Sequence, residues 1–258
     1  MSRISVIITS HERPKPLSRA LSSLSLQDCD DFEVVLSMDS WCAESIATFN
    51  SWSHPAKRLL VLPNARGPAE TRNVAKQVAT GKWVIFLDDD DQLVPGYLNN
   101  LKLSALDSST VVWTNYIIKQ CGSNNTNRVD DDWEPVLIAD RELNDLEVSN
   151  FIPNSALIYP TALIRNIDFD HHLASLEDWD FLINVSRRFQ LRSINVFGPI
   201  INKDDRLVTR NNGSQKNNDH FMDIIHIYRK WRSLSSDIRR ERFRKLNGRH
   251  LGISEMHL

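Results

Sequence analysis

The sequence lacks the marks of a membrane-spanning, secreted or nucleic-acid-binding protein. Its 31 basic and 33 acidic residues leave a formal net charge of -2, so we expect no nucleic acid among its partners. No apolar run approaches the roughly 20 residues that cross a bilayer. The first apolar run, residues 4–8, is interpreted as a strand rather than as part of a signal peptide. The three cysteines show no metal-ligand spacing and are expected to be free thiols in a reducing cytoplasm: Cys29, Cys42 and Cys121.

Glycine is missing where a phosphate-binding loop would need it. Residues 9–16, directly after the first expected strand, contain no glycine and therefore no Gly-x-Gly-x-x-Gly motif. Any phosphate at this place must be bound by side chains and a metal ion. The remaining composition is that of an ordinary globular chain, with 41% hydrophobic and 25% charged residues over 258 positions. This length suits one large α/β domain with an appendage.

Apolar runs and helical patterns alternate along the first 100 residues. Short runs rich in β-branched residues predict strands at 4–8, 32–37, 59–62 and 81–87. Helical patterns lie between them, although the one after residue 41 is weak. Polar residues follow each strand, and in open parallel sheets ligands bind outside the carboxyl ends of the strands.

Four consecutive carboxylates, Asp88–Asp91, directly follow the apolar run 81–87. Their mutual repulsion is tolerable only where cations or hydrogen-bond donors neutralise them. Hard divalent ions such as Mg²⁺ and Mn²⁺ prefer carboxylate oxygens and keep positions open for phosphate. A solvated acidic turn is the alternative interpretation. The abrupt change from a buried strand to four acids favours a metal–phosphate site.

Four motifs, taken in order, resemble those of family 2 glycosyltransferases, the inverting enzymes with a GT-A fold. Residues 9–14 (TSHERP) are similar to the loop after that family's first strand, and residues 38–40 (MDS) to the acidic end of its second strand. Residues 71–73 (TRN) match an Ala-Arg-Asn helix motif, and residues 87–91 (LDDDD) match Leu-Asp-x-Asp-Asp. The resemblance implies an α/β GT-A fold, with a Rossmann-like, mostly parallel sheet flanked by helices and a C-terminal helical extension.

The resemblance also implies roles for individual residues. His11 would pack on the base, and Asp39 would accept the uracil N–H, which favours a UDP-sugar donor. Arg72 would lie near the base or the pyrophosphate; a surface arginine paired with Glu70 or a neighbouring acid is the alternative. Asp91 would support the helix that follows. The implied nucleotide-sugar-binding residues are Thr9, His11, Glu12, Arg13, Asp39, Arg72, Asp88 and Asp89, and the implied ligands of Mn²⁺ or Mg²⁺ are Asp90 and Asp88.

A second acidic pair, Glu177 and Asp178, opens a helical pattern and is followed by Trp179. Acids in the first turn of a helix are favourable to its dipole, so a purely local role is one interpretation. The family, however, carries a Glu-Asp pair here, commonly followed by Trp, and the Asp is its usual general base. Inverting transfer needs a carboxylate that takes the acceptor proton. The resemblance thus implies Asp178 as base and Glu177 as a residue that orients the acceptor.

The segments outside these motifs are less informative. Residues 119–135 are expected to be irregular, with Asp130–Asp132 as a solvated turn. Near the end of the domain, Asn211 stands where the family places a histidine that closes over the pyrophosphate, and Arg210 precedes it. From residue 220 to 250 the chain is basic and amphipathic, which suits either contact with the anionic inner face of the cell membrane or docking on the domain.

These observations predict a GT-A domain over residues 1–215, with nucleotide-sugar binding in 1–100 and the acceptor side in 101–215, followed by a helical tail, 216–258. The expected function is metal-dependent transfer of a sugar from a nucleotide-sugar, with inversion, to a glycan or lipid-linked acceptor in bacterial surface polysaccharide synthesis. A sugar nucleotidyltransferase is an alternative, but that class would show a Gly-rich loop after the first strand. A non-catalytic nucleotide-sugar binder is the other alternative, and the two acidic centres argue against it.

Overall fold

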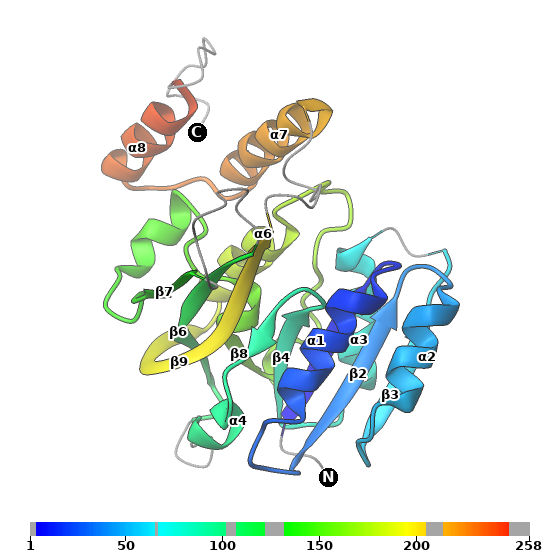
Figure 1. Cartoon of the computed structure of the whole chain (residues 1–258). Helices are drawn as coiled ribbons and strands as arrows, with labels where there is room; N and C mark the ends of the chain where they lie inside the picture. Colours follow the sequence, from blue (N-terminus) through cyan, green and yellow to red (C-terminus); the bar gives the residue numbers. More distant parts are fainter. Residues whose placement is uncertain (1–3, 65–66, 102–106, 122–131, 205–213, 248–258) are drawn as a thin grey trace.

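A computed structural model describes residues 4–64, 67–101, 107–121, 132–204 and 214–247. The strands among them form one nine-stranded sheet, in the order β3-β2-β1-β4-β8-β6-β9-β5, with β7 paired to β6. Helices cover both faces of this sheet, and two further helices lie beyond the end that carries β6, β7 and β9 (Figure 1). No helix within the described ranges is long and apolar enough to cross a membrane.

The first half of the sheet is parallel, as the alternation of strands and helices predicts. It contains β1 (Ile4–Ser10), β2 (Phe32–Met38), β3 (Lys57–Val61) and β4 (Trp83–Asp88). β1 is central and pairs in parallel with β2 and β4, while β2 pairs with β3. All four strands therefore end at the same edge of the sheet.

The second half is mixed, so the sheet as a whole is less parallel than expected. It contains β5 (Gln92–Leu93), β6 (Thr110–Cys121), β7 (Asp132–Val136), β8 (Leu157–Pro160) and β9 (Gln190–Asp204). β8 is antiparallel to both β4 and β6, whereas β6 and β9 are parallel with a register shift. β5 and β7 add antiparallel pairs with β9 and β6.

The helices lie mainly between the strands. They are α1 (Pro14–Leu24), α2 (Ala43–Ser51), α3 (Pro68–Val78), α4 (Tyr97–Asn100), α5 (Thr161–Ile164), α6 (Glu177–Ser186), α7 (Ser214–Lys230) and α8 (Ser236–Asn247). Two 3-10 helices, η2 (Leu143–Glu147) and η3 (Asn154–Ala156), precede β8.

Alternation along the buried strands divides the apolar side chains between two cores. Val6 and Ile8 of β1 pack with Leu17 and Leu21 of α1 on one face. On the other face, Ile7 of the same strand packs with residues of α3 and α6. Because α6 belongs to this second core, its first turn is brought to the carboxyl edge of the parallel strands.

The last two helices form a third apolar cluster with α6. Ile224, Ile227 and Tyr228 of α7 and Leu246 of α8 are buried against Trp179. These contacts show that the inner face of α7 and α8 docks on the domain, which was one of the two alternatives for residues 220–250. The outer face remains exposed.

One local expectation was wrong. Residues 132–136 form a strand rather than an irregular segment, because they pair with residues 116–120 of β6.

Gly81 lies between α3, which ends at Val78, and β4. A Cβ atom at Gly81 would lie 2.5 Å from the backbone nitrogen of Ser5, so glycine allows the close approach of β4 to β1. Residues 122–131, which include Asp130 and Asp131, lie outside the described part.

Candidate active site

The site is built at the carboxyl ends of three neighbouring strands. Pairing between β1 and its neighbours sets Thr9 beside Asp88 and Ser10 beside Met38. The loop after β1, the turn after β2 and the acids after β4 therefore start from adjacent positions. Most of the site residues predicted in the first 100 positions lie in these three segments.

His11 and Asp39 contact each other across this edge. The Nδ1 atom of His11 lies 2.6 Å from Oδ1 of Asp39. The His11 ring is 61% exposed, whereas the Asp39 side chain is only 9% exposed. An open imidazole face beside a buried carboxylate is an arrangement that suits a planar base with an N–H group. Glu12, between His11 and Arg13, is exposed and has a left-handed backbone with φ of 51°.

Arg13 neutralises part of the acidic cluster. Its guanidinium donates to Asp90 Oδ2 at 2.7 Å and also to Asp89 Oδ1. Burial raises the pKa of Asp89 to about 7, although Arg13 opposes this shift. Asp89 is fully buried and binds the Arg13 guanidinium from the interior of the protein. The Asp90 side chain, in contrast, is 26% exposed.

Asp91 is held by hydrogen bonds to two other elements of the fold. It accepts hydrogen bonds from Ser155 Oγ at 3.0 Å and from the Asn202 backbone N–H at 3.4 Å. Asn202 also donates through its side chain to the Asp90 carbonyl at 2.6 Å. Burial, with the neighbouring charges of Asp88 and Asp90, raises the pKa of Asp91 well above its ordinary value. The acidic turn is thereby fixed to both η3 and β9.

Arg72 joins the two acidic centres. Its guanidinium donates to Asp88 Oδ1 at 2.6 Å and to Glu177 Oε1 at 2.8 Å. The residue is 4% exposed and lies over the Phe169 ring, 5.5 Å from its centroid. Burial opposes its charge, but Asp88 and Glu177 together raise the pKa of Arg72 above its ordinary value. A surface arginine paired with Glu70 is therefore the wrong interpretation.

Asp178 lies next to this bridge and is partly buried. It accepts hydrogen bonds from Asn150 Nδ2 at 3.1 Å and from the Trp179 backbone N–H at 2.8 Å. Burial and the neighbouring charge of Glu177 raise the pKa of Asp178 to about 7, against the opposing effect of Arg72. A carboxylate with such a pKa is suited to proton transfer near neutral pH.

Asp88 and Asp90 fit one kind of divalent-metal site. Among the described residues no three His, Cys, Asp or Glu side chains are grouped as a complete protein cage. Mg²⁺, however, is commonly bound by one or two carboxylates, with substrate phosphates and water as the other ligands. The arginine contacts described above use one oxygen of each carboxylate, and both side chains are partly exposed. The donor set therefore suits a metal that arrives with a phosphate-bearing substrate.

Several residues of the site were missed by sequence reasoning. Asn150, Ser155 and Asn202 hold Asp178, Asp91 and the acidic turn, but isolated amides and hydroxyls give no pattern of their own. Phe169 stacks on Phe181 of α6 with ring centroids 3.9 Å apart, and lies beneath Arg72.

Two other expectations concern residues that the structure does not describe, Arg210 and Asn211. His171 and His172 are exposed.

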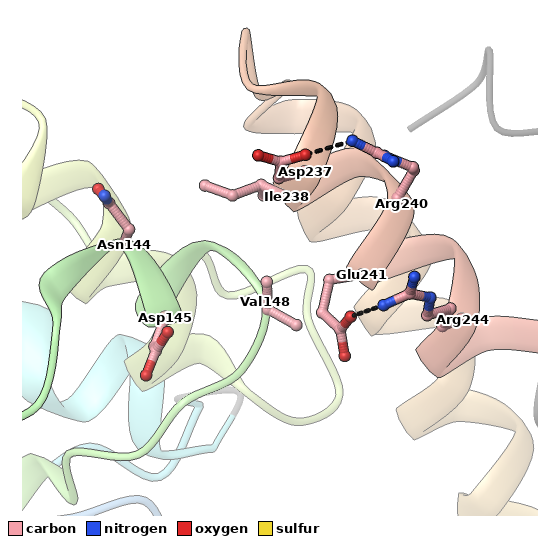
Figure 2. Close-up of a pocket in the computed structure, with 8 residues that line it drawn as sticks. All are labelled: Asn144, Asp145, Val148, Asp237, Ile238, Arg240, Glu241 and Arg244. Carbon is pink, nitrogen blue, oxygen red and sulfur yellow. Dashed lines mark hydrogen bonds and ion pairs between the residues drawn. The ribbon is translucent and has the colours of Figure 1, made fainter.

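A pocket of about 380 Å³ lies elsewhere, between η2 and α8 (Figure 2). None of the predicted site residues lines it. Its arginines are paired within α8, Arg240 with Asp237 and Arg244 with Glu241. We therefore place the candidate active site at the strand ends and not in this pocket.

Similar proteins share both this sequence region and this fold. Residues 5–167 match Glycosyl transferase family 2. The GalNAc(5)-diNAcBac-PP-undecaprenol beta-1,3-glucosyltransferase of Campylobacter jejuni is 29% identical over 126 residues, which are 48% of this chain and 41% of that protein. The chain spans less than half the length of the first curated relatives it matches.

Two solved structures show the same fold. Staphylococcus aureus TarS 1-349 in complex with UDP-GlcNAc has a TM-score of 0.65 and 21% identity, covering 99% of this chain and 74% of that one. A mannosyltransferase from Pyrobaculum calidifontis in complex with GDP-Man and Mn²⁺ has a TM-score of 0.63 and 15% identity, covering 95% and 69%. These likenesses agree with the GT-A-like arrangement of the sheet and helices. With the family match covering well over half of its residues, the chain belongs to glycosyl transferase family 2.

Proposed function

We propose that this protein is a metal-dependent, inverting glycosyltransferase that moves a sugar from a UDP-sugar to a hydroxyl of a glycan or lipid-linked acceptor, in bacterial surface polysaccharide synthesis. The observation that carries the proposal is the Arg72 bridge. One buried guanidinium contacts Asp88 of the acidic turn and Glu177 of α6, which are far apart in the sequence. The acidic turn, proposed to anchor the diphosphate, and the first turn of α6, which carries the proposed base Asp178, are therefore held in one site.

The proton acceptor in this proposal is Asp178. In a single displacement the acceptor oxygen bonds to the anomeric carbon as the bond from that carbon to the diphosphate breaks. The hydroxyl proton moves to the Asp178 carboxylate, and the nucleoside diphosphate leaves with the bonding electrons. A pKa of about 7 lets Asp178 be substantially ionised at neutral pH and still basic enough to take the proton. Glu177, fixed by Arg72, is proposed to orient the acceptor.

The donor is proposed to lie along the strand ends. We propose that Asp39 accepts the N–H of uracil and that His11 packs on the base. Arg13, which bonds to Asp89 and Asp90, is proposed to shape the loop around the diphosphate. Asp88 and Asp90 would hold Mn²⁺ or Mg²⁺, which supplies electrostatic stabilisation of the charge on the leaving diphosphate. TarS in complex with UDP-GlcNAc and the mannosyltransferase in complex with GDP-Man and Mn²⁺ support a nucleotide-sugar and a metal.

A panel of nucleotide-sugars tests the proposal. The purified protein is incubated with each donor and Mn²⁺ or Mg²⁺, and release of the nucleoside diphosphate and nucleotide affinity are measured. We expect turnover of at least one UDP-sugar and a metal-dependent affinity that Asp90→Ala removes. Asp140→Ala, a carboxylate outside the site, is the matched control. If no donor is bound or turned over and Asp90→Ala changes nothing, the proposed function is wrong.

The same panel separates the alternatives. A sugar nucleotidyltransferase would instead release pyrophosphate from a nucleoside triphosphate and a sugar phosphate. A non-catalytic binder would retain UDP affinity without any turnover. The lack of glycine in residues 9–16 argues against the nucleotidyltransferase, and the two acidic centres argue against the binder.

The division of the chain and its location also stay proposals. We propose that residues 1–215 form the catalytic domain, with residues 216–258 as a tail, in the cytoplasm. Contact of residues 220–250 with an anionic membrane surface is compatible with the exposed face of the tail, where Arg229, Arg232 and Leu234 are open to solvent. Sedimentation with anionic vesicles, compared with neutral ones, tests this contact.

A further inference from the structure

The turn that leads into α6 has an unusual backbone. Leu176, directly before Glu177 and Asp178, has φ of 61° and ψ of 19°. A non-glycine residue in this left-handed region is strained and persists only where surrounding contacts fix it. The direction in which Glu177 and Asp178 enter the site depends on this residue, because it is the N-cap of their helix. Something outside the turn must hold it.

Asp223 of α7 is the group that holds this turn. Its Oδ2 atom accepts hydrogen bonds from the Ser175 backbone N–H at 2.7 Å and from Ser175 Oγ at 3.0 Å. Asp223 is 9% exposed, and Ser175 is equally buried. His220, one turn earlier in α7, also contacts Ser175 Oγ at 3.1 Å. The residue before Leu176 is thus tied to α7 through both its backbone and its side chain.

The same helix is fixed to α6 further along. Lys230 and Trp231, at the end of α7, donate to the buried carboxylate of Asp180 at 2.8 and 2.7 Å. Figure 1 shows α7 lying against the region of α6. Asp180 follows Asp178 by two residues, so α7 contacts the segment on both sides of the acidic pair. Among the described side chains, Asp223 is the carboxylate that accepts hydrogen bonds from Ser175.

We propose that Asp223 is a positioning residue for sugar transfer: it holds the strained Ser175–Leu176 turn and thereby aims Glu177 and Asp178 at the reacting atoms. This inference rests on the proposed function, because it assigns Asp223 a role in the same reaction. It gives the C-terminal helices a part in catalysis without contact with either substrate. Small displacements of a catalytic group cost much rate, which is why such a support matters.

The experiment compares Asp223→Ala with Tyr228→Phe. Tyr228 lies on the same helix and donates to the Val148 carbonyl at 2.6 Å, away from the turn. Both variants lose hydrogen bonds that dock α7, so both are expected to lower the thermal midpoint. Only Asp223→Ala is expected to lower kcat, by about 10- to 100-fold, with the affinity for the donor nucleotide unchanged. Asp223→Asn, which keeps an acceptor oxygen, is expected to restore most of kcat.

Backbone amide exchange at residues 175–178 gives a second readout that needs no substrate. Faster exchange in Asp223→Ala, with wild-type exchange there in Tyr228→Phe, is the expected result. Equal loss of kcat in both variants, or unchanged kcat and exchange in Asp223→Ala, overturns the inference. If Asp223→Ala does not fold, Ser175→Ala, which removes the side-chain hydrogen bond to Asp223, takes its place, and wild-type kcat and exchange in that variant overturn the inference. A wild-type protein that transfers no sugar refutes the proposed function, and the exchange data then decide on the turn alone.

Discussion

Four consecutive aspartates have four different environments in this protein. Asp88 contacts Arg72, Asp89 is buried on Arg13, Asp90 is partly exposed, and Asp91 is buried on Ser155. Their charges are thus divided among two arginines, a hydroxyl and solvent. The resemblance implied Asp88 and Asp90 as metal ligands and Asp91 as a support for the helix that follows. Asp91 instead bonds to Ser155 and the Asn202 backbone. The contact of Asp89 with Arg13 was not implied, because it joins residues 76 positions apart.

The ionisation of Asp178 sets the expected pH dependence of transfer. A general base acts only when ionised, and burial with Glu177 raises the pKa of Asp178 to about 7. Its ionised fraction falls about tenfold for each pH unit below that value. We therefore expect kcat to rise with pH through about 7 and then to level off. The measurement is kcat between about pH 5.5 and 8.5 at saturating donor and metal.

Donor affinity over the same range is the control. This comparison separates the ionisation of the base, which affects kcat, from the ionisation of groups that bind the nucleotide. A kcat that stays constant from about pH 5.5 to 8 would contradict the assignment of Asp178 as the titrating base.

The strands and helices of the first half were predictable because their signals are local. The strands are continuous apolar runs, and α1 and α3 begin with proline, which is favourable in the first turn. β7 was missed because its residues 132–136 include Pro135 and Glu134 and show no apolar alternation; only pairing with β6 makes them a strand. Arg72 was predicted to lie near the donor, but its contact with Glu177 spans 105 positions and follows from the packing of α3 and α6.

This contact predicts a large effect of Arg72→Met on stability. The substitution leaves Asp88 and Glu177 without their shared partner, and breaking a buried ion pair typically costs about 3–5 kcal/mol. We expect the free energy of unfolding, measured by urea denaturation at neutral pH, to fall by that order. Asp88 is partly exposed, so the lower end of the range is expected.

Arg244→Met is the matched control for this measurement. Arg244 also pairs with a carboxylate, Glu241, but the two side chains are 72% and 53% exposed. Exposed pairs contribute about 0–1 kcal/mol, so the control is expected to change stability little. Equal effects of the two substitutions would mean that Arg72 does not form the bridge described here.

At the scale of the molecule, the parallel half and the mixed half supply different parts of the site. The strand ends of β1, β2 and β4 provide the residues proposed for the donor, and α6, with the η2–η3 segment, provides the proposed base and its partner Asn150. The C-terminal helices cover α6 from outside. Sequence patterns predicted the basic amphipathic character of these helices. They did not predict that Arg242 would be fully buried, donating to the carbonyls of Glu147 and Trp231.

The central claim is that Asp178 takes the acceptor proton in a site that binds the donor independently. Asp178→Asn tests it most directly, because asparagine keeps the size of the side chain and can still accept the Trp179 N–H. We measure sugar transfer and nucleotide-sugar affinity in the same preparation, with Mn²⁺ or Mg²⁺ present. We expect a loss of kcat of about 10²- to 10⁴-fold with donor affinity unchanged. Transfer at the wild-type rate by Asp178→Asn would contradict it.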